Sequence, residues 1–131
     1  MPRSKKARVF ISFDYDHDDD LKVLLVGQAK NDDSPFVIED WSIKQASKDW
    51  KAEARTRIQR VDQVIVICGT HTHQAAGVSA EIEIARQVKT PYFLLRGRAS
   101  GCVRRPRGTS VWETVYPWTW DNLHAITTRK R

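Results

Sequence analysis

Residues 64–85, with the sequence VIVICGTHTHQAAGVSAEIEIA, decide the fold of this chain. The first five residues form a continuous apolar run, which is typical of a strand buried on both faces of a parallel sheet. The run ends at Gly69, a polar loop follows, and apolar residues then recur at helical spacing from Val78. The stretch therefore predicts a strand, a loop and a helix. It places Glu81 in or near the first turn of that helix, at the edge of the sheet where ligands bind.

The rest of the chain continues this alternation of strands and helices. Runs of β-branched and aromatic residues, bounded by polar or proline-containing segments, mark the further strands. They are predicted at residues 7–13, 36–38 and 90–95, with a short edge strand within residues 111–116. Because strands and helices alternate, the sequence predicts one α/β domain. Its architecture is a three-layer, doubly wound sandwich with a central parallel sheet of four to five strands and right-handed crossovers.

The helix after the first strand is predicted to begin in an acidic segment. A carboxylate of Asp18, Asp19 or Asp20 would cap the exposed N–H groups of this helix and would interact favourably with the positive end of the helix dipole. The cluster NDDSP at residues 31–35 ends this helix. One face is marked by Leu21, Leu24, Leu25 and Gln28.

The next helix has two candidate starts. Ser42 and Gln45 have the spacing of a capping box, and Ser47 is an equally good first residue. Truncation of Trp50 to alanine is expected to cost about 3–5 kcal/mol, because Trp50 belongs to one buried stripe of this helix. The stripe consists of Trp50, Ala54, Ile58 and Val61.

Apolar residues also indicate how the second half of the chain packs. Ile84 and Val88 widen the apolar face of the helix after Gly69, so this helix is either well covered or used in self-association. The centre of that face is formed by Val78, Ile82 and Ala85. The C-terminal segment is expected to be held against the core by Trp118, Trp120 and Leu123.

The size and composition are those of a single globular domain, residues 1–131. Basic residues concentrate at residues 1–6, in a predicted mobile loop at residues 98–110, and in a predicted basic tail at residues 124–131. No aromatic residues interleave them, so the net charge of +6 does not predict nucleic-acid binding. No apolar run approaches the ~20 residues of a membrane span, so no membrane partner is expected. The two cysteines form no disulfide framework and the N-terminus has no signal-peptide core, which favours a cytoplasmic protein.

Several polar side chains are candidates for chemistry. Glu81 and Glu83 point to different sides of a helix, so at most one of them faces the crevice, and the alternative is that both are solvated. The aspartates of residues 14–20 are candidate Mg²⁺ ligands, and they could also resemble the acidic pocket of a phospho-accepting receiver domain. A receiver domain needs an aspartate at the end of the third strand, and here that strand ends in Cys68 and Gly69. Helix capping is therefore the better interpretation of these aspartates. His71 and His73 lack a second ligand pair, so zinc is not expected.

Two further kinds of chemistry are disfavoured by the sequence. Cys68 lies in an apolar run, so we interpret it as a buried strand residue rather than a nucleophile. The chain contains neither the glycine motif of dinucleotide-binding dehydrogenases nor a P-loop.

Six segments follow one another in a fairly specific order. They are RVFISFDY (residues 8–15), EDWS (39–42), KDWKAEARTRI (48–58), VDQVIVICGTHTH (61–73), GVSAEIEIA (77–85) and WTWDNL (118–123). In this order and spacing they resemble the TIR-like family that includes the TIR proteins of Thoeris anti-phage defence. The likeness runs from about Arg8 to Leu123, and it implies a flavodoxin-like fold, in agreement with the sheet predicted above.

The resemblance implies a site that acts on NAD⁺ as a substrate, with no cofactor and no metal. In TIR enzymes a glutamate in the helix after the third strand acts on the ribose linked to nicotinamide, and the matching residue is Glu81. Many members have tryptophan four residues before this glutamate, where this chain has Gly77. The wall of the family's nucleotide pocket is matched by Phe10, Ser12, Phe13, Asp14, Tyr15, Asp40, Trp41, Ser42, Gly69 and Thr70.

The resemblance further implies an NAD⁺ glycohydrolase or ADP-ribosyl cyclase that makes an ADP-ribose-derived, cyclic signal in anti-phage immunity. Breaking the bond between ribose and nicotinamide leaves an oxocarbenium-like ribose, which a carboxylate stabilises. TIR enzymes commonly self-associate, so a homo-oligomer is expected, together with a separate effector protein that reads the product. Two alternatives remain. One is a non-catalytic TIR-like adaptor, favoured by Gly77 and by the wide apolar face around Ile84. The other is a nucleotide-binding nuclease or deoxyribosyltransferase relative.

Overall fold

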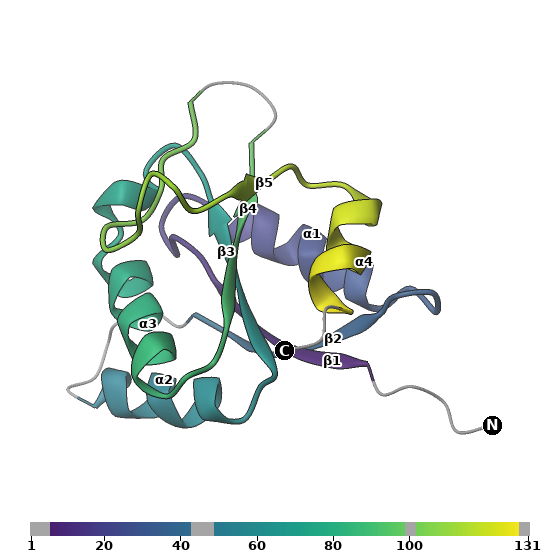
Figure 1. Cartoon of the computed structure of the whole chain (residues 1–131), viewed down its shortest axis with the longest axis horizontal. Coiled ribbons are helices and arrows are strands. Elements are labelled where there is room, and N and C mark those ends of the chain that lie inside the picture. The colour runs from purple at the N-terminus through teal and green to yellow at the C-terminus, as the bar shows by residue number, and fades with distance from the viewer. Residues whose placement is uncertain (1–5, 43–48, 99–101, 129–131) are drawn as a thin grey trace.

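The structure is a computed structural model, and it describes residues 6–42, 49–98 and 102–128. Its centre is a parallel sheet of five strands in the order β2-β1-β3-β4-β5, which is the flavodoxin-like order and confirms the predicted fold class (Figure 1). The strands are β1 (Ala7–Ser12), β2 (Phe36–Trp41), β3 (Gln63–Cys68), β4 (Tyr92–Arg96) and β5 (Val115–Tyr116). The helices are α1 (Asp19–Ala29), α2 (Trp50–Gln59), the short 3₁₀ helix η1 (Thr72–Gln74), α3 (Ala76–Gln87) and α4 (Trp120–Thr127).

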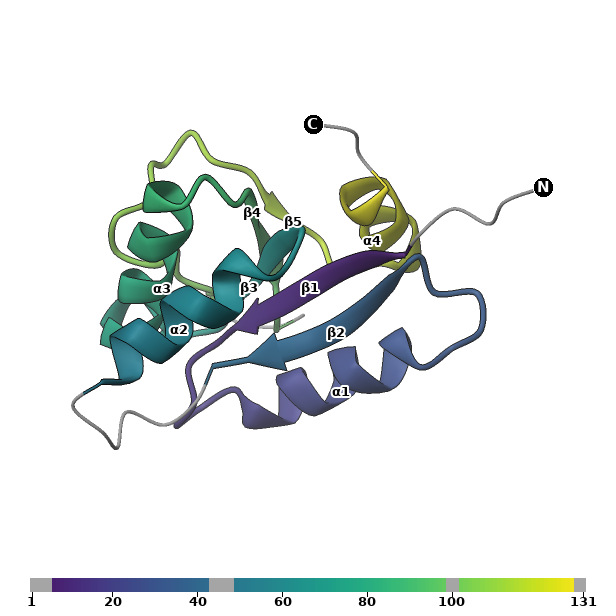
Figure 2. The same ribbon diagram turned by 90° about the horizontal axis from the view of Figure 1, so that it is seen from below.

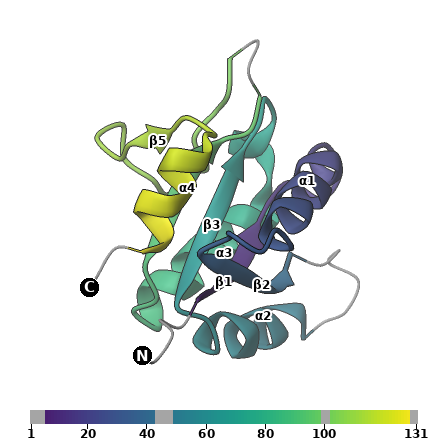
Figure 3. The ribbon, with the colours of Figure 1, turned by 90° about the vertical axis from the view of Figure 1, so that its right-hand side faces the viewer.

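The helices cover both faces of the sheet and so make three layers. Helices α2 and α3 lie on one face, while α1 and α4 lie on the other, as Figures 1 and 3 show from two directions. Each face has its own apolar core, one containing Ala54 and Ile58 of α2 and the other containing Leu25 of α1 and Leu123 of α4. No helix in the described part of the chain is both long and apolar enough to cross a membrane.

Strand β3 sits in the middle of the sheet, and all six of its residues are buried. Its side chains alternate between the two cores, with Val64 and Val66 on one side and Ile65 and Ile67 on the other. A strand that is covered on both faces has no position for a polar side chain on a wet face, which explains the continuous apolar run.

Strand β2 is longer than the sequence predicted. It continues from Phe36 to Trp41, three residues beyond the predicted end at Ile38, because Asp40 and Trp41 still pair with Phe10 and Ile11 of β1. β2 is an edge strand, as Figure 2 shows, so one of its sides needs no apolar partner and tolerates charged residues. At the opposite edge, only Val115 and Tyr116 form β5, which is shorter than the predicted segment 111–116.

Helix α1 begins where predicted, directly after Asp18, but Asp18 makes no capping hydrogen bond. Its carboxylate instead accepts a hydrogen bond from Arg98, with 3.1 Å between Oδ1 and Nη2. Leu21 and Leu25 are buried as predicted, whereas Leu24 is 59% exposed, so its assignment to the buried face was wrong. Leu24 lies one residue before Leu25 and is therefore turned about 100° around the helix axis, away from the sheet.

Helix α2 begins at Trp50, after Asp49, so the predicted start at Ser42 was wrong. Ser42 directs its hydroxyl to other groups, which are described with the site below. The alternative start at Ser47, and the capping partner Gln45, lie outside the described residues. Ala54, Ile58 and Val61 are buried as predicted, while Trp50 is only partly buried against the core.

The predicted basic tail, residues 124–131, begins within a helix. Thr119 caps α4 by accepting a hydrogen bond from the backbone N–H of Asn122, and the helix continues to Thr127. Leu123 and Ile126 are buried, so this segment is anchored in the core beside α1, as expected from its apolar residues. Residues 129–131 lie outside the described residues.

The described parts of the predicted mobile loop make specific contacts. Arg98 binds the carboxylates of Asp18 and Asp20, and the backbone N–H of Arg104 donates to the carbonyl of Gly69 at 2.9 Å. Residues 99–101 lie outside the described residues, and the mobility of the loop stays a prediction.

Truncating a fully buried residue of α2 should be more damaging than truncating the partly buried Trp50. We expect Ile58→Ala to lower the free energy of unfolding by about 2–5 kcal/mol, because it leaves a cavity in the core below α2 and α3. We expect Trp50→Ala to cost less than the value of about 3 kcal/mol typical of a buried tryptophan. Urea unfolding of both variants measures the difference, and a larger loss for Trp50→Ala would contradict this packing.

Candidate active site

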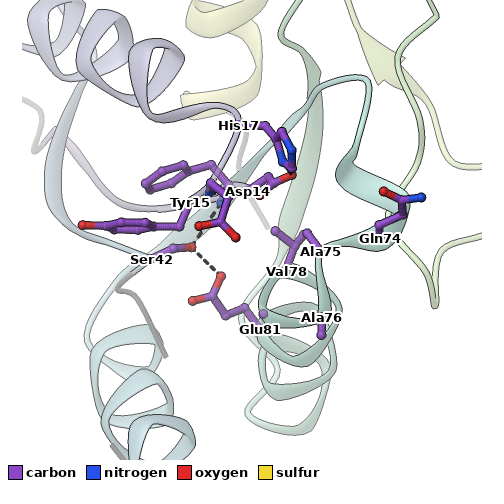
Figure 4. Close-up of a pocket in the computed structure, with 12 residues that line it drawn as sticks. Asp14, Tyr15, His17, Ser42, Gln74, Ala75, Ala76, Val78 and Glu81 are labelled. Carbon is purple, nitrogen blue, oxygen red and sulfur yellow. Dashed lines mark hydrogen bonds and ion pairs between the residues drawn. The ribbon is translucent and has the colours of Figure 1, made fainter. Parts of the chain in front are cut away.

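A cavity of about 430 Å³ lies at the carboxyl ends of β1 and β3. After these two neighbouring strands the chain crosses to opposite faces of the sheet, since β1 leads into α1 and β3 leads into α3. This is the switch point at which open parallel sheets bind their ligands. The walls, shown in Figure 4, come from three segments and consist of Phe13, Asp14, Tyr15, Asp16, His17, Ser42, Gln74, Ala75, Ala76, Gly77, Val78 and Glu81.

Glu81 projects from α3 into this cavity and is only 2% exposed. It is the sixth residue of α3, so it lies in the second turn, which agrees with the prediction that it lies in or near the first turn. Glu83 points away from the cavity and is exposed, with its carboxylate near Arg86. The structure therefore excludes the alternative in which both glutamates are solvated, and it distinguishes Glu81 as the one that faces the crevice.

Two serine hydroxyls hold one oxygen of the Glu81 carboxyl group. Ser12 Oγ, at the end of β1, donates to Oε1 at 2.7 Å, and Ser42 Oγ, just after β2, donates to the same atom at 2.6 Å. Ser42 Oγ in turn accepts a hydrogen bond from the backbone N–H of Phe13 at 3.1 Å (Figure 4). Three segments far apart in the sequence are thus joined at Oε1. Because both serine hydroxyls bind Oε1, neither of them occupies Oε2, the carboxyl oxygen that a ligand could contact.

The burial of Glu81 changes its acidity. Removal from water raises the pKa of Glu81 to about 7, while the hydrogen bonds from Ser42 and Ser12 act in the opposite direction. Burial dominates because the charged form of a carboxyl group loses more hydration than two hydroxyl donors restore. A carboxyl group with a pKa near neutrality, in a cavity, is the kind of perturbed group that marks a functional site.

The opposite wall of the cavity is acidic and aromatic. The Asp14 carboxylate is largely buried, lies 2.7 Å from His17 Nδ1, and accepts a hydrogen bond from the backbone N–H of Asp16. His17 stacks on His71, with ring centroids 4.0 Å apart. Phe13 stacks on Tyr15 with centroids 5.8 Å apart. These contacts fix the loop after β1 around the entrance to the cavity.

The structure brings together about half of the residues that the sequence singled out for the site. Phe13, Asp14, Tyr15, Ser42 and Glu81 line the cavity, and Ser12 lies directly behind Glu81. The other predicted residues lie outside its lining. Phe10 is in the core on the α2 and α3 side, Asp40 pairs with Arg57, Trp41 lies under Lys22, and Thr70 contacts His71.

Gly69, also predicted for the pocket, has a structural reason to be glycine. A Cβ atom at this position would lie 2.3 Å from Oδ2 of Asp18, which is far too close. Asp18 is buried, and this close approach lets its carboxylate reach Arg98 from beneath the loop after β3. Gly69 therefore supports the loops at this edge of the sheet without lining the cavity.

The segment just before Glu81 was not among the pocket residues implied by the family resemblance, but the loop at residues 69–77 and the first turn of the next helix were predicted at the binding edge of the sheet. Gln74, Ala75, Ala76 and Val78 line the cavity, and Ala75 gives the start of α3 no side-chain cap. Small residues at a helix start are a weak signal on their own. The strand-loop-helix pattern nevertheless places this turn at the binding edge of the sheet, and that pattern was available from the sequence.

The other candidates for chemistry are less favourable in the structure. Within the described residues, no group of three or more His, Cys, Asp or Glu side chains is arranged to hold a metal ion. Cys68 is fully buried, and burial raises the pKa of its thiol to about 12, so it stays protonated and unreactive at neutral pH.

The raised pKa of Glu81 predicts how stability depends on pH. Because the folded chain binds this proton more tightly than the unfolded chain, the contribution of Glu81 is fully present below about pH 4.5 and is lost as the pH rises through about 7. The difference corresponds to about 3 kcal/mol. Urea unfolding at pH 5 and pH 8 should therefore show a fall in the wild-type chain that is absent from Glu81→Gln. Equal pH dependence of the two proteins would show that the raised pKa of Glu81 is not the cause of the change in stability.

Comparison with known families agrees with the fold. The family model described as Thoeris protein ThsB, TIR-like domain, matches residues 10–98, which is well over half of the chain and includes every residue that lines the cavity. None of the curated proteins compared with the chain matches it. The family match confirms the resemblance drawn from the sequence. The chain belongs to the TIR-like domain family of the Thoeris protein ThsB.

Proposed function

We propose that this chain cleaves the bond between nicotinamide and ribose in NAD⁺ and releases an ADP-ribose derivative. The product would be a cyclic signal in anti-phage immunity, read by a separate effector protein. The observation that carries the proposal is the buried Glu81 carboxyl group in a cavity at the switch point of the sheet. The family supports the defence context, since its members are Thoeris proteins.

The chemistry matches the arrangement around Glu81. When the glycosidic bond breaks, its electron pair moves to the pyridinium nitrogen, so nicotinamide leaves as a neutral molecule and needs little acid assistance. Positive charge develops on the ribose, and the ionised Glu81 carboxylate would stabilise it in a site shielded from water. Ser12 and Ser42 fix Oε1, so Oε2 is the atom that would face the ribose.

The wall opposite Glu81 has a role in this proposal as well. Asp14 and Tyr15 would contact the bound nucleotide, and the hydrogen bonds of the Asp14 carboxylate to Asp16 and His17 hold the loop that forms this wall. A pre-formed site of this kind requires less ordering when substrate binds. Self-association, expected of TIR enzymes, would act on a cavity that the single chain already contains.

Replacing Glu81 should abolish the reaction and leave the fold intact. Glu81→Gln keeps the hydrogen-bond acceptor for the two serines but cannot carry a negative charge, so we expect nicotinamide release to fall by at least about a hundred-fold. Glu83→Gln is the matched control, because it removes an exposed carboxylate from the same helix. Nicotinamide released from NAD⁺ is measured by chromatography at high protein concentration, with and without phage lysate.

The outcome also decides between this proposal and the adaptor alternative. Normal turnover by Glu81→Gln would remove Glu81 from the mechanism. No nicotinamide release by the wild-type chain under either condition would support a non-catalytic adaptor, and release of a base from nucleosides alone would indicate the deoxyribosyltransferase type.

The pH dependence of the reaction should report the ionisation of Glu81. If the carboxylate must be charged, kcat/KM falls about ten-fold for each pH unit below about 7 and is constant above it, because this parameter follows the free enzyme. Bound NAD⁺ places a cation beside Glu81 and so lowers its pKa, which moves the fall in kcat to lower pH. Initial rates between pH 5.5 and 8.5 measure both profiles. A flat kcat/KM profile would show that Glu81 does not act as a charged group.

A further inference from the structure

We propose that the cavity recognises only the cationic nicotinamide ribonucleotide half of NAD⁺, so that nicotinamide mononucleotide and nicotinamide riboside are substrates too. This inference rests on the proposed function and specifies its substrate class. It follows from the charges, the aromatic rings and the dimensions of the cavity.

The charges in the cavity favour a cation. Its lining contains the carboxyl groups of Glu81, Asp14 and Asp16, and among the described residues that line it there is neither lysine nor arginine. A pyridinium ring carries a full positive charge, which the carboxylates of the lining attract. Phosphates beside these carboxylates would be repelled, so the second phosphate of a dinucleotide belongs at the entrance or outside it.

The aromatic rings can accommodate one ring system and not two. Phe13 and Tyr15 form a stacked pair on one wall, and Tyr15 is 43% exposed, so its free face can receive a pyridinium ring. The other ring at the entrance, His17, is already stacked on His71. Adenine therefore finds no second free ring in the described lining, and its half of NAD⁺ extends beyond the cavity.

The dimensions of α3 fit a ribose with one phosphate. Glu81 lies five residues after Ala76, the first residue of the helix, which corresponds to about 7.5 Å along the helix axis. Residues at the start of α3 line the same cavity as Glu81, and the positive end of the uncapped helix would offset the repulsion of one 5′-phosphate by the carboxylates. A ribose beside Glu81 with its phosphate at the start of α3 spans this distance. The adenosine half adds no contact that the reacting bond needs.

The reaction of the smaller substrate is balanced in the same way as that of NAD⁺. In nicotinamide mononucleotide the bond between C1′ and the pyridinium nitrogen breaks, and its electron pair goes to the nitrogen of the leaving nicotinamide. Water forms the new bond to C1′ and releases one proton to solvent. The products are nicotinamide and ribose 5-phosphate.

The test is a comparison of four substrates with the wild-type chain. NAD⁺, nicotinamide mononucleotide and nicotinamide riboside carry the same reacting bond, while nicotinic acid mononucleotide has an added carboxylate that cancels the ring's charge. We expect kcat/KM for nicotinamide mononucleotide within about ten-fold of the value for NAD⁺, a difference of at most about 1.4 kcal/mol in transition-state binding. We expect nicotinic acid mononucleotide to be at least about ten-fold poorer than nicotinamide mononucleotide.

A matched pair of variants tests the acidic wall. Asp16→Asn removes a carboxylate from the lining and should raise KM for nicotinamide mononucleotide with little change in kcat, because ground-state attraction to the cation is weakened. Asp19→Asn removes an exposed carboxylate close by, on the first turn of α1 and outside the lining, and should behave as the wild type.

The outcomes separate this inference from the proposed function. If NAD⁺ is cleaved but nicotinamide mononucleotide is more than about ten-fold poorer, the inference is overturned and the proposed function stands. If none of the four compounds is cleaved, the proposed function fails. In that case calorimetric titration with nicotinamide riboside decides recognition, and absence of binding overturns the inference as well.

Discussion

The site depends on two short hydrogen bonds that converge on one oxygen of the Glu81 carboxyl group. Ser12, Ser42 and Glu81 come from β1, from the end of β2 and from α3, and no two of them are close in sequence. The bonds therefore act as a tie between the sheet and the helix that closes the cavity. They also partly offset the burial that raises the pKa of Glu81, so the carboxyl group can ionise near neutral pH. Structural support and chemical tuning are provided by the same atoms.

The sheet could be predicted from the sequence because its central strand leaves little ambiguity. A run without polar residues such as Val64–Cys68 fits only a strand covered on both sides, and the alternation of strands and helices then determines a three-layer architecture. Local boundaries were less predictable. Ser42 had the spacing of a helix cap, but its hydroxyl binds Glu81 instead, a partner 39 residues away that spacing rules do not consider. Tertiary contacts of this kind override local preferences.

The site was predictable in part for the same reason. The loops after β1 and β3 had to meet at one edge of the sheet, so Asp14, Tyr15 and Glu81 were correctly expected near each other. Asp40 and Trp41 were expected there as well, because the family resemblance matched them, with Ser42, to the nucleotide pocket. Successive residues of a strand point to opposite sides, however, and this segment belongs to β2 until Trp41, so its side chains find Arg57 and Lys22 instead.

The two outer strands of the sheet limit how copies of this chain can join. β5 offers the edge backbone groups of only two residues, and β2 carries Glu39 together with the ion pair between Asp40 and Arg57, and charged side chains of this kind discourage pairing at an edge strand. Continuation of the hydrogen-bonded ladder from one molecule into the next is therefore disfavoured at either side. Higher-order assemblies of this domain would be built from helix surfaces and connecting segments, and they would not share the architecture of amyloid-like fibres.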